Sequence, residues 1–154
     1  EEILLIVPSD HLIEKQSEYE AVVRKAEELA RNGKLVTFGI KPGYAETGYG
    51  YIEASGLEVK SFKEKPDQKT AEAYVQAGNY FWNSGMFCMK AGVFLEELKA
   101  FAPDIYDQSL RAYTNARSDV AVRVNLEDMK AIRSESIDYA VMEKSRKVNV
   151  VPAD

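Results

Sequence analysis

The sequence predicts an α/β fold with a mixed sheet flanked by helices, on three observations. The aliphatic run 2–7, which Pro8 ends, is typical of a strand buried on both faces of a sheet. Apolar residues then recur at helical spacing over 17–32, and a second β-rich run covers 34–40. Strand, helix and strand in this order indicate a βαβ unit, so we expect the two strands to form a parallel pair.

The middle of the chain predicts an antiparallel insertion. Residues 41–50 form a loop rich in glycine, and Ser55-Gly56 is a hairpin signal between two β-rich runs. The elements expected here are, in order, strands over 49–54 and 57–64, a short helix over 70–76 that Ala77-Gly78 stops, and a strand over 86–90.

The last third predicts mostly helices. Apolar stripes indicate helices over 91–101 and 104–117, and a further helix covers 137–144. Ser136 is placed to cap that helix, and Asp138 lies in its positive first turn. A final strand runs from Val148 to the last residue, and we expect the whole chain to form one unit.

Composition excludes several classes of protein. The apolar stretch Ile3–Val7 is far shorter than the roughly 20 residues of a membrane helix, so no membrane association is expected. The 20 Lys and Arg against 25 Asp and Glu give a net charge of -5, which argues against nucleic acid as a partner. One cysteine allows no internal disulfide, which fits a reducing compartment, and we expect a cytoplasmic location. The composition is compatible with a homo-oligomer.

Asp10 and the segment 46–51 are the first candidate functional residues. Ligands of open α/β sheets bind beyond the carboxyl ends of strands, where the Asp10 carboxylate could hold Mg²⁺ beside phosphates. Alternatively, Ser9 and Asp10 only close a turn. Gly48 and Gly50 would let a ligand approach the backbone closely, although a tight entry into a strand explains them equally well.

Further candidates follow the later strands. The Glu64 carboxylate could accept hydrogen bonds from two sugar hydroxyls, and the Lys65 ammonium could neutralise a phosphate. Strand alternation sends Glu64 to one face and Lys65 to the other, although charged strand ends are often only solvated. Asn83 offers both a donor and an acceptor to a hydroxyl, whereas Cys88 is expected to be buried and inert.

Six segments, in this order, resemble the mannose-1-phosphate guanylyltransferases, a family of sugar nucleotidyltransferases, particularly the bacterial type in which a phosphomannose isomerase domain can follow. The similarity covers the chain from Ile3 to its last residue. The segments are Pro8-Ser9-Asp10-His11, Val36-Thr37-Phe38-Gly39-Ile40-Lys41-Pro42, Glu46-Thr47-Gly48-Tyr49-Gly50-Tyr51-Ile52, Phe62-Lys63-Glu64-Lys65-Pro66-Asp67, Trp82-Asn83-Ser84-Gly85-Met86-Phe87 and Ser136-Ile137-Asp138-Tyr139-Ala140-Val141-Met142-Glu143-Lys144.

The resemblance implies a partial Rossmann-like nucleotide-diphospho-sugar transferase fold and a role in polysaccharide biosynthesis. It implies transfer of GMP from GTP to mannose 1-phosphate, which yields GDP-mannose and pyrophosphate. The sugar phosphate oxygen attacks the α-phosphorus in line, so alignment and charge neutralisation carry the reaction.

The resemblance also implies roles for individual residues. Asp10 is implied to hold the catalytic Mg²⁺ and the nucleotide, and Lys65 to lie near the sugar phosphate. The implied substrate-binding residues are Gly48, through its backbone and with Thr47 and Tyr49 beside it, Glu64 and Asn83, which bind mannose hydroxyls, and Ser136 and Asp138, for which helix capping is the alternative.

Two family segments lie outside these residues. The family's glycine-rich triphosphate loop precedes the equivalent of Ile3, and its second metal-binding aspartate follows the equivalent of residues 152–154. We therefore expect 1–154 to be the central part of a transferase domain and this polypeptide alone to be inactive. A related transferase for another hexose or base, and a non-catalytic module that binds sugar nucleotides, remain as alternatives.

Overall fold

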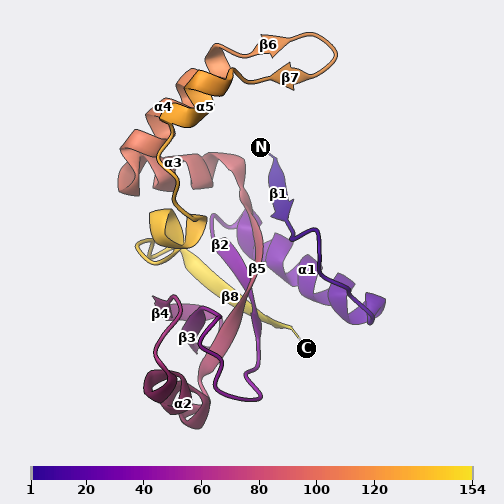
Figure 1. Ribbon diagram of the computed structural model, residues 1–154. Coiled ribbons are helices and arrows are strands. Elements are labelled where there is room, and N and C mark those ends of the chain that lie inside the picture. The colour runs from indigo at the N-terminus through magenta and orange to yellow at the C-terminus, as the bar shows by residue number, and fades with distance from the viewer. Residues whose placement is uncertain (1, 154) are drawn as a thin grey trace. The chain divides into compact units, whose positions relative to one another are not determined.

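The computed structural model describes residues 2–153 and confirms the predicted α/β class (Figure 1). Contacts within the chain divide it into two compact units. The first unit comprises the chain up to Val93 together with the chain from Arg146 onward, and the second comprises Phe94–Ser145. Asp154, the last residue of the final expected strand, lies outside the described residues.

A six-stranded mixed sheet forms the first unit, in the order β1-β5-β2-β8-β4-β3 (Figure 1). Within residues 2–153, only the pair β2–β8 runs parallel, and every other pairing in this sheet is antiparallel. The strands are β1 (Ile3–Ile6), β2 (Leu35–Ile40), β3 (Tyr51–Ser55), β4 (Glu58–Lys63), β5 (Tyr80–Lys90) and β8 (Val148–Ala153).

The expected parallel pair between the first two strands is wrong. Both β1 and β2 are antiparallel to β5, which lies between them, so they share a direction without pairing. The predicted two-sided burial of β1 is also wrong, because Leu4, Leu5 and Ile6 are 36%, 41% and 42% exposed. An edge strand and a central strand can carry the same aliphatic run, and only the pairing partners distinguish them.

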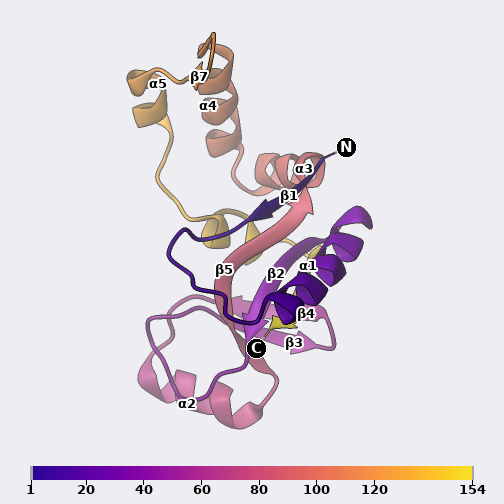
Figure 2. The same cartoon turned by 90° about the vertical axis from the view of Figure 1, so that its right-hand side faces the viewer.

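Helix α1 (Gln16–Arg31) packs on β2, β5 and β8, and Figure 2 shows it lying along β2. The predicted stripe is confirmed: Ala26 and Ala30 are fully buried in a core cluster with strand residues such as Phe38 and Val151. Charged residues on the opposite face form ion pairs one turn apart, including Arg24 with Glu20.

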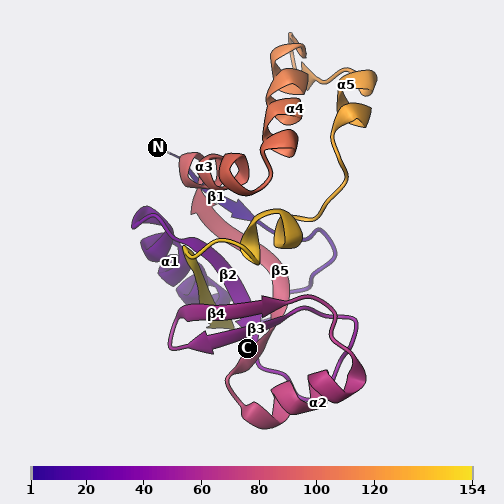
Figure 3. The same ribbon diagram turned by 90° about the vertical axis from the view of Figure 1, so that its left-hand side faces the viewer.

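The β3–β4 hairpin is confirmed, with Gly56 at φ +62° in its turn. Helix α2 (Gln68–Ala77) follows, and Figure 3 shows it beside this hairpin. The Asp67 side chain caps the helix by accepting a hydrogen bond of 2.8 Å from the Thr70 N–H, and Gly78 ends it in the left-handed conformation. The rings of Tyr74 and Tyr80 stack 4.0 Å apart, which joins α2 to β5.

The second unit consists mainly of helices. Helix α3 begins in the first unit at Ala91, and α4 packs against α5. The elements are α3 (Ala91–Phe101), α4 (Pro103–Thr114), the two-stranded hairpin of β6 (Arg117–Ser118) and β7 (Val122–Arg123), α5 (Leu126–Ala131) and the π-helix η1 (Asp138–Met142). No helix within 2–153 is both long enough and apolar enough to span a membrane.

Three details of the second unit differ from the prediction. Helix α4 ends at Thr114, and Arg117 belongs to a hairpin that the sequence did not predict. The segment after Ser136 forms a π-helix, in which the Glu143 N–H donates to the Asp138 carbonyl five residues earlier. Its N-cap is Ile137 without a side-chain cap hydrogen bond, so the predicted capping by Ser136 is wrong, whereas Asp138 does open the helix.

Candidate functional site

An interruption along one edge of β5 creates the candidate site. Tyr80–Trp82 pair with β3, whereas Phe87–Lys90 pair with β1, so 83–86 lie between the two partners. Because β1 and β3 are both antiparallel to β5, the end of β1 and the start of β3 point toward this interruption. The Asn83 N–H donates to the Gly50 carbonyl at 2.8 Å, and a Cβ placed on Gly85 would lie 3.9 Å from Pro8 Cγ.

Glu64 and Asn83 meet across Gly50 at this interruption. A Cβ placed on Gly50 would lie 2.3 Å from Glu64 Oε2 and 3.5 Å from Asn83 Cβ, so only glycine leaves room for the carboxylate. Glu64 is well shielded, with its side chain 11% exposed. The structure therefore brings together two of the residues that the sequence singled out, one from the end of β4 and one from β5.

Thr37 on β2 supports Asn83 from within the sheet. Thr37 is fully buried, and its hydroxyl donates to Asn83 Oδ1 at 3.0 Å. Asn83 Oδ1 also accepts a hydrogen bond from the Gly85 N–H at 3.2 Å. Thr37 was identified from the sequence only as part of the motif 36–42. A polar residue inside an apolar strand run is itself a signal of a buried polar contact.

Lys65 folds back toward Glu64, so its expected place on the opposite face is wrong. Strand β4 ends at Lys63, and Lys65 adopts φ +46°, which ends the alternation of side chains. A non-glycine residue in this conformation costs about 1–2 kcal/mol. The Lys65 ammonium lies 3.3 Å from Glu64 Oε1, with the lysine side chain 63% exposed. The shielded Glu64 carboxylate and the exposed Lys65 ammonium therefore form an ion pair.

The loop 41–50 is held by contacts of its own. The Glu46 carboxylate accepts a hydrogen bond of 2.9 Å from the Gly48 N–H, while the Glu46 N–H donates to the Tyr51 hydroxyl. Tyr44 and Tyr49 each form a T-shaped ring contact with Trp82, with ring centroids 5.0 and 5.4 Å away.

Thr47, Gly48 and Tyr49 are exposed, and the predicted contact between Gly48 and a hexose stays a prediction. Gly50 is the glycine that lies against Glu64 and Asn83. A glycine with an ordinary φ, directly before a strand, is the signal of a close approach that could have identified it.

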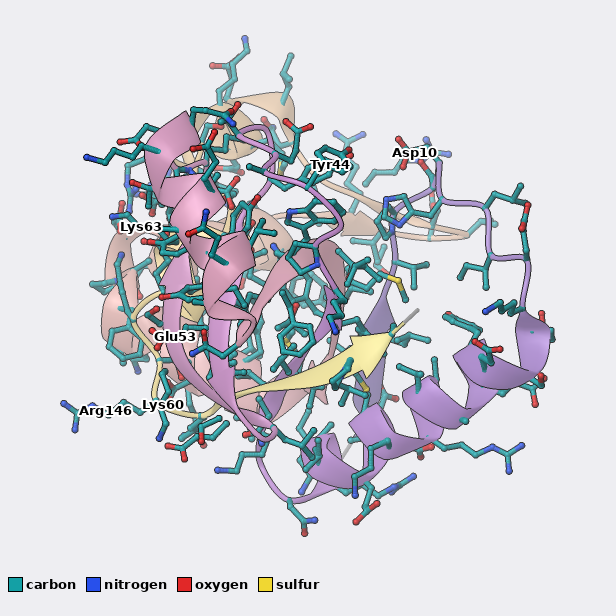
Figure 4. All side chains as sticks on the ribbon, turned by 90° about the horizontal axis from the view of Figure 1, so that it is seen from below. Asp10, Tyr44, Glu53, Lys60, Lys63 and Arg146 are labelled. Atoms are coloured by element: carbon teal, nitrogen blue, oxygen red, sulfur yellow. The ribbon has the colours of Figure 1, made fainter. Side chains whose placement is uncertain are left out.

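Asp10 lies in the exposed turn after β1, and Figure 4 shows its place on that segment, with Tyr44 labelled on the 41–50 loop. Residues 2–153 hold no cluster of three or more His, Cys, Asp or Glu side chains suited to a metal ion. Mg²⁺ is commonly bound by one or two carboxylates together with substrate phosphates and waters. Asp10 therefore fits the chemistry of a single carboxylate ligand.

Ser136 and Asp138 belong to the second unit. The Ser136 carbonyl accepts a hydrogen bond from the Ala140 N–H, and Asp138 opens η1. Cys88 is buried in the first unit as predicted. Burial raises the pKa of its thiol and Glu27 adds to the shift, which favours the protonated and unreactive form.

Comparisons with known proteins show the family of the chain. The model of the nucleotidyl transferase family matches residues 1–129. The chain is 43% identical to mannose-1-phosphate guanylyltransferase 2 of Escherichia coli O157:H7 and 46% identical to the xanthan biosynthesis protein XanB of Xanthomonas campestris pv. campestris (strain B100), each over 99% of the chain. The chain spans about a third (34%) of the length of each of these relatives.

A solved structure is similar in both fold and sequence. It is that of a Helicobacter pylori protein described as mannose-6-phosphate isomerase, with a TM-score of 0.94 and 39% identity. The match covers 99% of this chain and 62% of that protein. The expected resemblance to the mannose-1-phosphate guanylyltransferases is thus confirmed across nearly the whole chain.

Proposed function

The chain belongs to the nucleotidyl transferase family, and from this membership we propose that the protein containing it is a mannose-1-phosphate guanylyltransferase. The reaction transfers GMP from GTP to mannose 1-phosphate, releases pyrophosphate and forms GDP-mannose. Relatives named for this activity and for xanthan biosynthesis support a role in supplying GDP-mannose for polysaccharides.

The meeting of Glu64 and Asn83 across Gly50 is the observation that carries the proposal. A shielded carboxylate and an amide together offer acceptors and donors to adjacent hydroxyl groups of a sugar. Polar groups shielded from water discriminate strongly, because an epimer leaves one of them without its hydrogen bond. We assign hydroxyl recognition of the mannose to these two residues.

Two further residues of the first unit are proposed to help neutralise the charge of the phosphates. We propose that the Lys65 ammonium, which lies 3.3 Å from Glu64 Oε1, binds the phosphate of a sugar whose hydroxyls Glu64 holds. Asp10 would provide a carboxylate ligand to Mg²⁺, which supplies positive charge to the phosphates when bound. Thr47, Gly48 and Tyr49 are proposed to line the sugar site, and Ser136 and Asp138 are proposed substrate-binding residues of the second unit.

The test is an assay of the complete protein that contains these residues. Purified protein with GTP, mannose 1-phosphate and MgCl₂ should form GDP-mannose and pyrophosphate in equal amounts, and EDTA should abolish both. GTP hydrolysis without GDP-mannose, or no product at all, would contradict the proposal. Because GTP and the product are intracellular metabolites, the predicted cytoplasmic location is retained.

The same assay separates the alternatives. Replacing GTP by ATP or UTP, and mannose 1-phosphate by glucose 1-phosphate, tests for a related transferase with another base or hexose. Binding of GDP-mannose without turnover would favour the non-catalytic module. Conversion of mannose 6-phosphate to fructose 6-phosphate is measured separately, because the similar Helicobacter pylori protein carries the name of that isomerase.

A further inference from the structure

We propose that Thr37 is a positioning residue that fixes the orientation of the Asn83 side-chain amide, so that Asn83 serves as the hydrogen-bond donor and Glu64 as the acceptor toward the sugar. The inference rests on the proposed function and deepens it, because it assigns opposite hydrogen-bonding roles to the two hydroxyl-binding residues.

Thr37 is anchored in the core of the first unit. It lies in the middle of β2 with no exposed surface, between the buried residues Val36 and Phe38. Its hydroxyl lies 3.0 Å from Asn83 Oδ1 and 3.3 Å from the Met86 carbonyl, which are both acceptors. The Thr37 hydroxyl thus faces two acceptors on β5, and the shorter contact is with Asn83.

The Gly85 N–H identifies which atom of the Asn83 amide faces Thr37. A backbone N–H can only donate, so the amide atom 3.2 Å from it must be the oxygen. Rotating the amide by half a turn would place its NH₂ group against the Gly85 N–H, so that two donors would face each other. The Thr37 hydroxyl adds a second donor to the same oxygen and reinforces this orientation.

The orientation determines what Asn83 offers to a ligand. Because Oδ1 accepts from both Thr37 and Gly85, the NH₂ group of Asn83 points away from these two residues. Glu64, a carboxylate that only accepts, reaches the same glycine, since its Oε2 lies 2.3 Å from a Cβ placed on Gly50. A sugar is then recognised by one hydroxyl that accepts and one that donates.

The experiment compares four variants of the complete protein: Thr37→Val, Thr37→Ser, Asn83→Ala and the double variant of Thr37→Val with Asn83→Ala. Valine keeps the shape of threonine and removes the donor, while serine keeps the donor. We expect Thr37→Val to raise the KM for mannose 1-phosphate about tenfold while kcat and the KM for GTP change by less than about twofold. Thr37→Ser should restore the KM to within about twofold of the wild type.

The double variant separates positioning from a structural effect. If Thr37 acts through Asn83, Thr37→Val should add nothing to the KM increase that Asn83→Ala already causes. An equal further increase in the Asn83→Ala background would overturn the inference. So would an unchanged KM in Thr37→Val, or a Thr37→Ser variant as impaired as Thr37→Val.

Two further measurements keep the inference testable if turnover is absent or Thr37→Val does not fold. The ¹³Cγ resonance of Asn83 reports hydrogen bonds accepted by Oδ1, so it should move in Thr37→Val and stay in place in Thr37→Ser. Asn83→Asp keeps both accepted hydrogen bonds and removes the N–H donors, so binding of mannose 1-phosphate should weaken more than tenfold. An unmoved resonance, or wild-type binding by Asn83→Asp, refutes the inference. Absence of GDP-mannose from the wild-type protein refutes only the proposed function.

Discussion

Gly50→Ala tests the geometry of the candidate site most directly. The added Cβ would lie 2.3 Å from Glu64 Oε2, about 1 Å closer than a carbon and an oxygen approach without a hydrogen bond, so the carboxylate must move by about that distance. Gly50 does not have a positive φ, so alanine is compatible with the backbone. The Asn83 Cβ, 3.5 Å away, is in ordinary contact and need not move.

The expected result is a protein that folds and binds sugar poorly. Glu64 can swing aside, so the free energy of unfolding should change by less than about 1 kcal/mol. A displacement of about 1 Å in a positioned group can cost up to a hundredfold in rate, and we expect kcat/KM for mannose 1-phosphate to fall about 10- to 100-fold. The KM for GTP should stay near its wild-type value.

Gly43→Ala is the matched control in the same loop. No atom lies within 4 Å of its added Cβ, so kcat/KM should stay near its wild-type value. Steady-state kinetics of the complete protein compares the two variants. Wild-type kcat/KM in Gly50→Ala, or an equal loss in Gly43→Ala, would refute this reasoning.

Two more predictions concern stability. Gly39→Ala should destabilise the fold by about 1–3 kcal/mol in urea titrations, because its Cβ would lie 2.7 Å from both Phe81 Cβ and Val150 Cγ2, whereas Gly43→Ala, with no atom within 4 Å, should be near neutral. The Arg133 guanidinium, 2.7 Å from Asp104, lowers the pKa of that carboxyl below its ordinary 3.8. The stabilisation is therefore complete above that value and is lost as the pH falls through the lowered pKa. An NMR titration should show the lowered pKa, and Arg133→Ala should raise it; a wild-type value at or above 3.8, or no rise in Arg133→Ala, would contradict the ion pair's effect.

Local features of the sequence predicted local structure well. The stripe on α1 and the turn at Gly56 were predicted because each depends on residues within one turn or one hairpin. The strand β5 was predicted to begin only at Met86, and the residues directly before it, Asn83-Ser84-Gly85, are of types that are common in turns. In the structure, Gly85 takes φ +72° inside a strand of eleven residues, so the turn signal marks an irregularity of the strand rather than its end.

Features that depend on pairing between distant residues were not predictable. Nothing in the run Ile3–Ile6 indicates that β5 would separate it from β2, or that its side chains would remain partly exposed. The same limit applies to the site. Sequence motifs identified Glu64 and Asn83, but their meeting at Gly50 depends on β3, β4 and β5 lying together, which no spacing along the chain reveals.

The residues of the proposed site differ in how firmly they are held, because some are anchored in the core and others are exposed. Asn83 is held by Thr37, whose neighbours Val36 and Phe38 are core residues, so moving the amide breaks a hydrogen bond to a residue that is fixed in the sheet. Lys65 is exposed and bound to Glu64 by an ion pair that water screens. A sugar phosphate that draws the Lys65 ammonium away leaves Glu64 as an unpaired acceptor for the sugar hydroxyls. Under the proposed roles, hydroxyl recognition is therefore preorganised, whereas phosphate binding exchanges one partner of Lys65 for another, and the Glu64 carboxylate couples the two events.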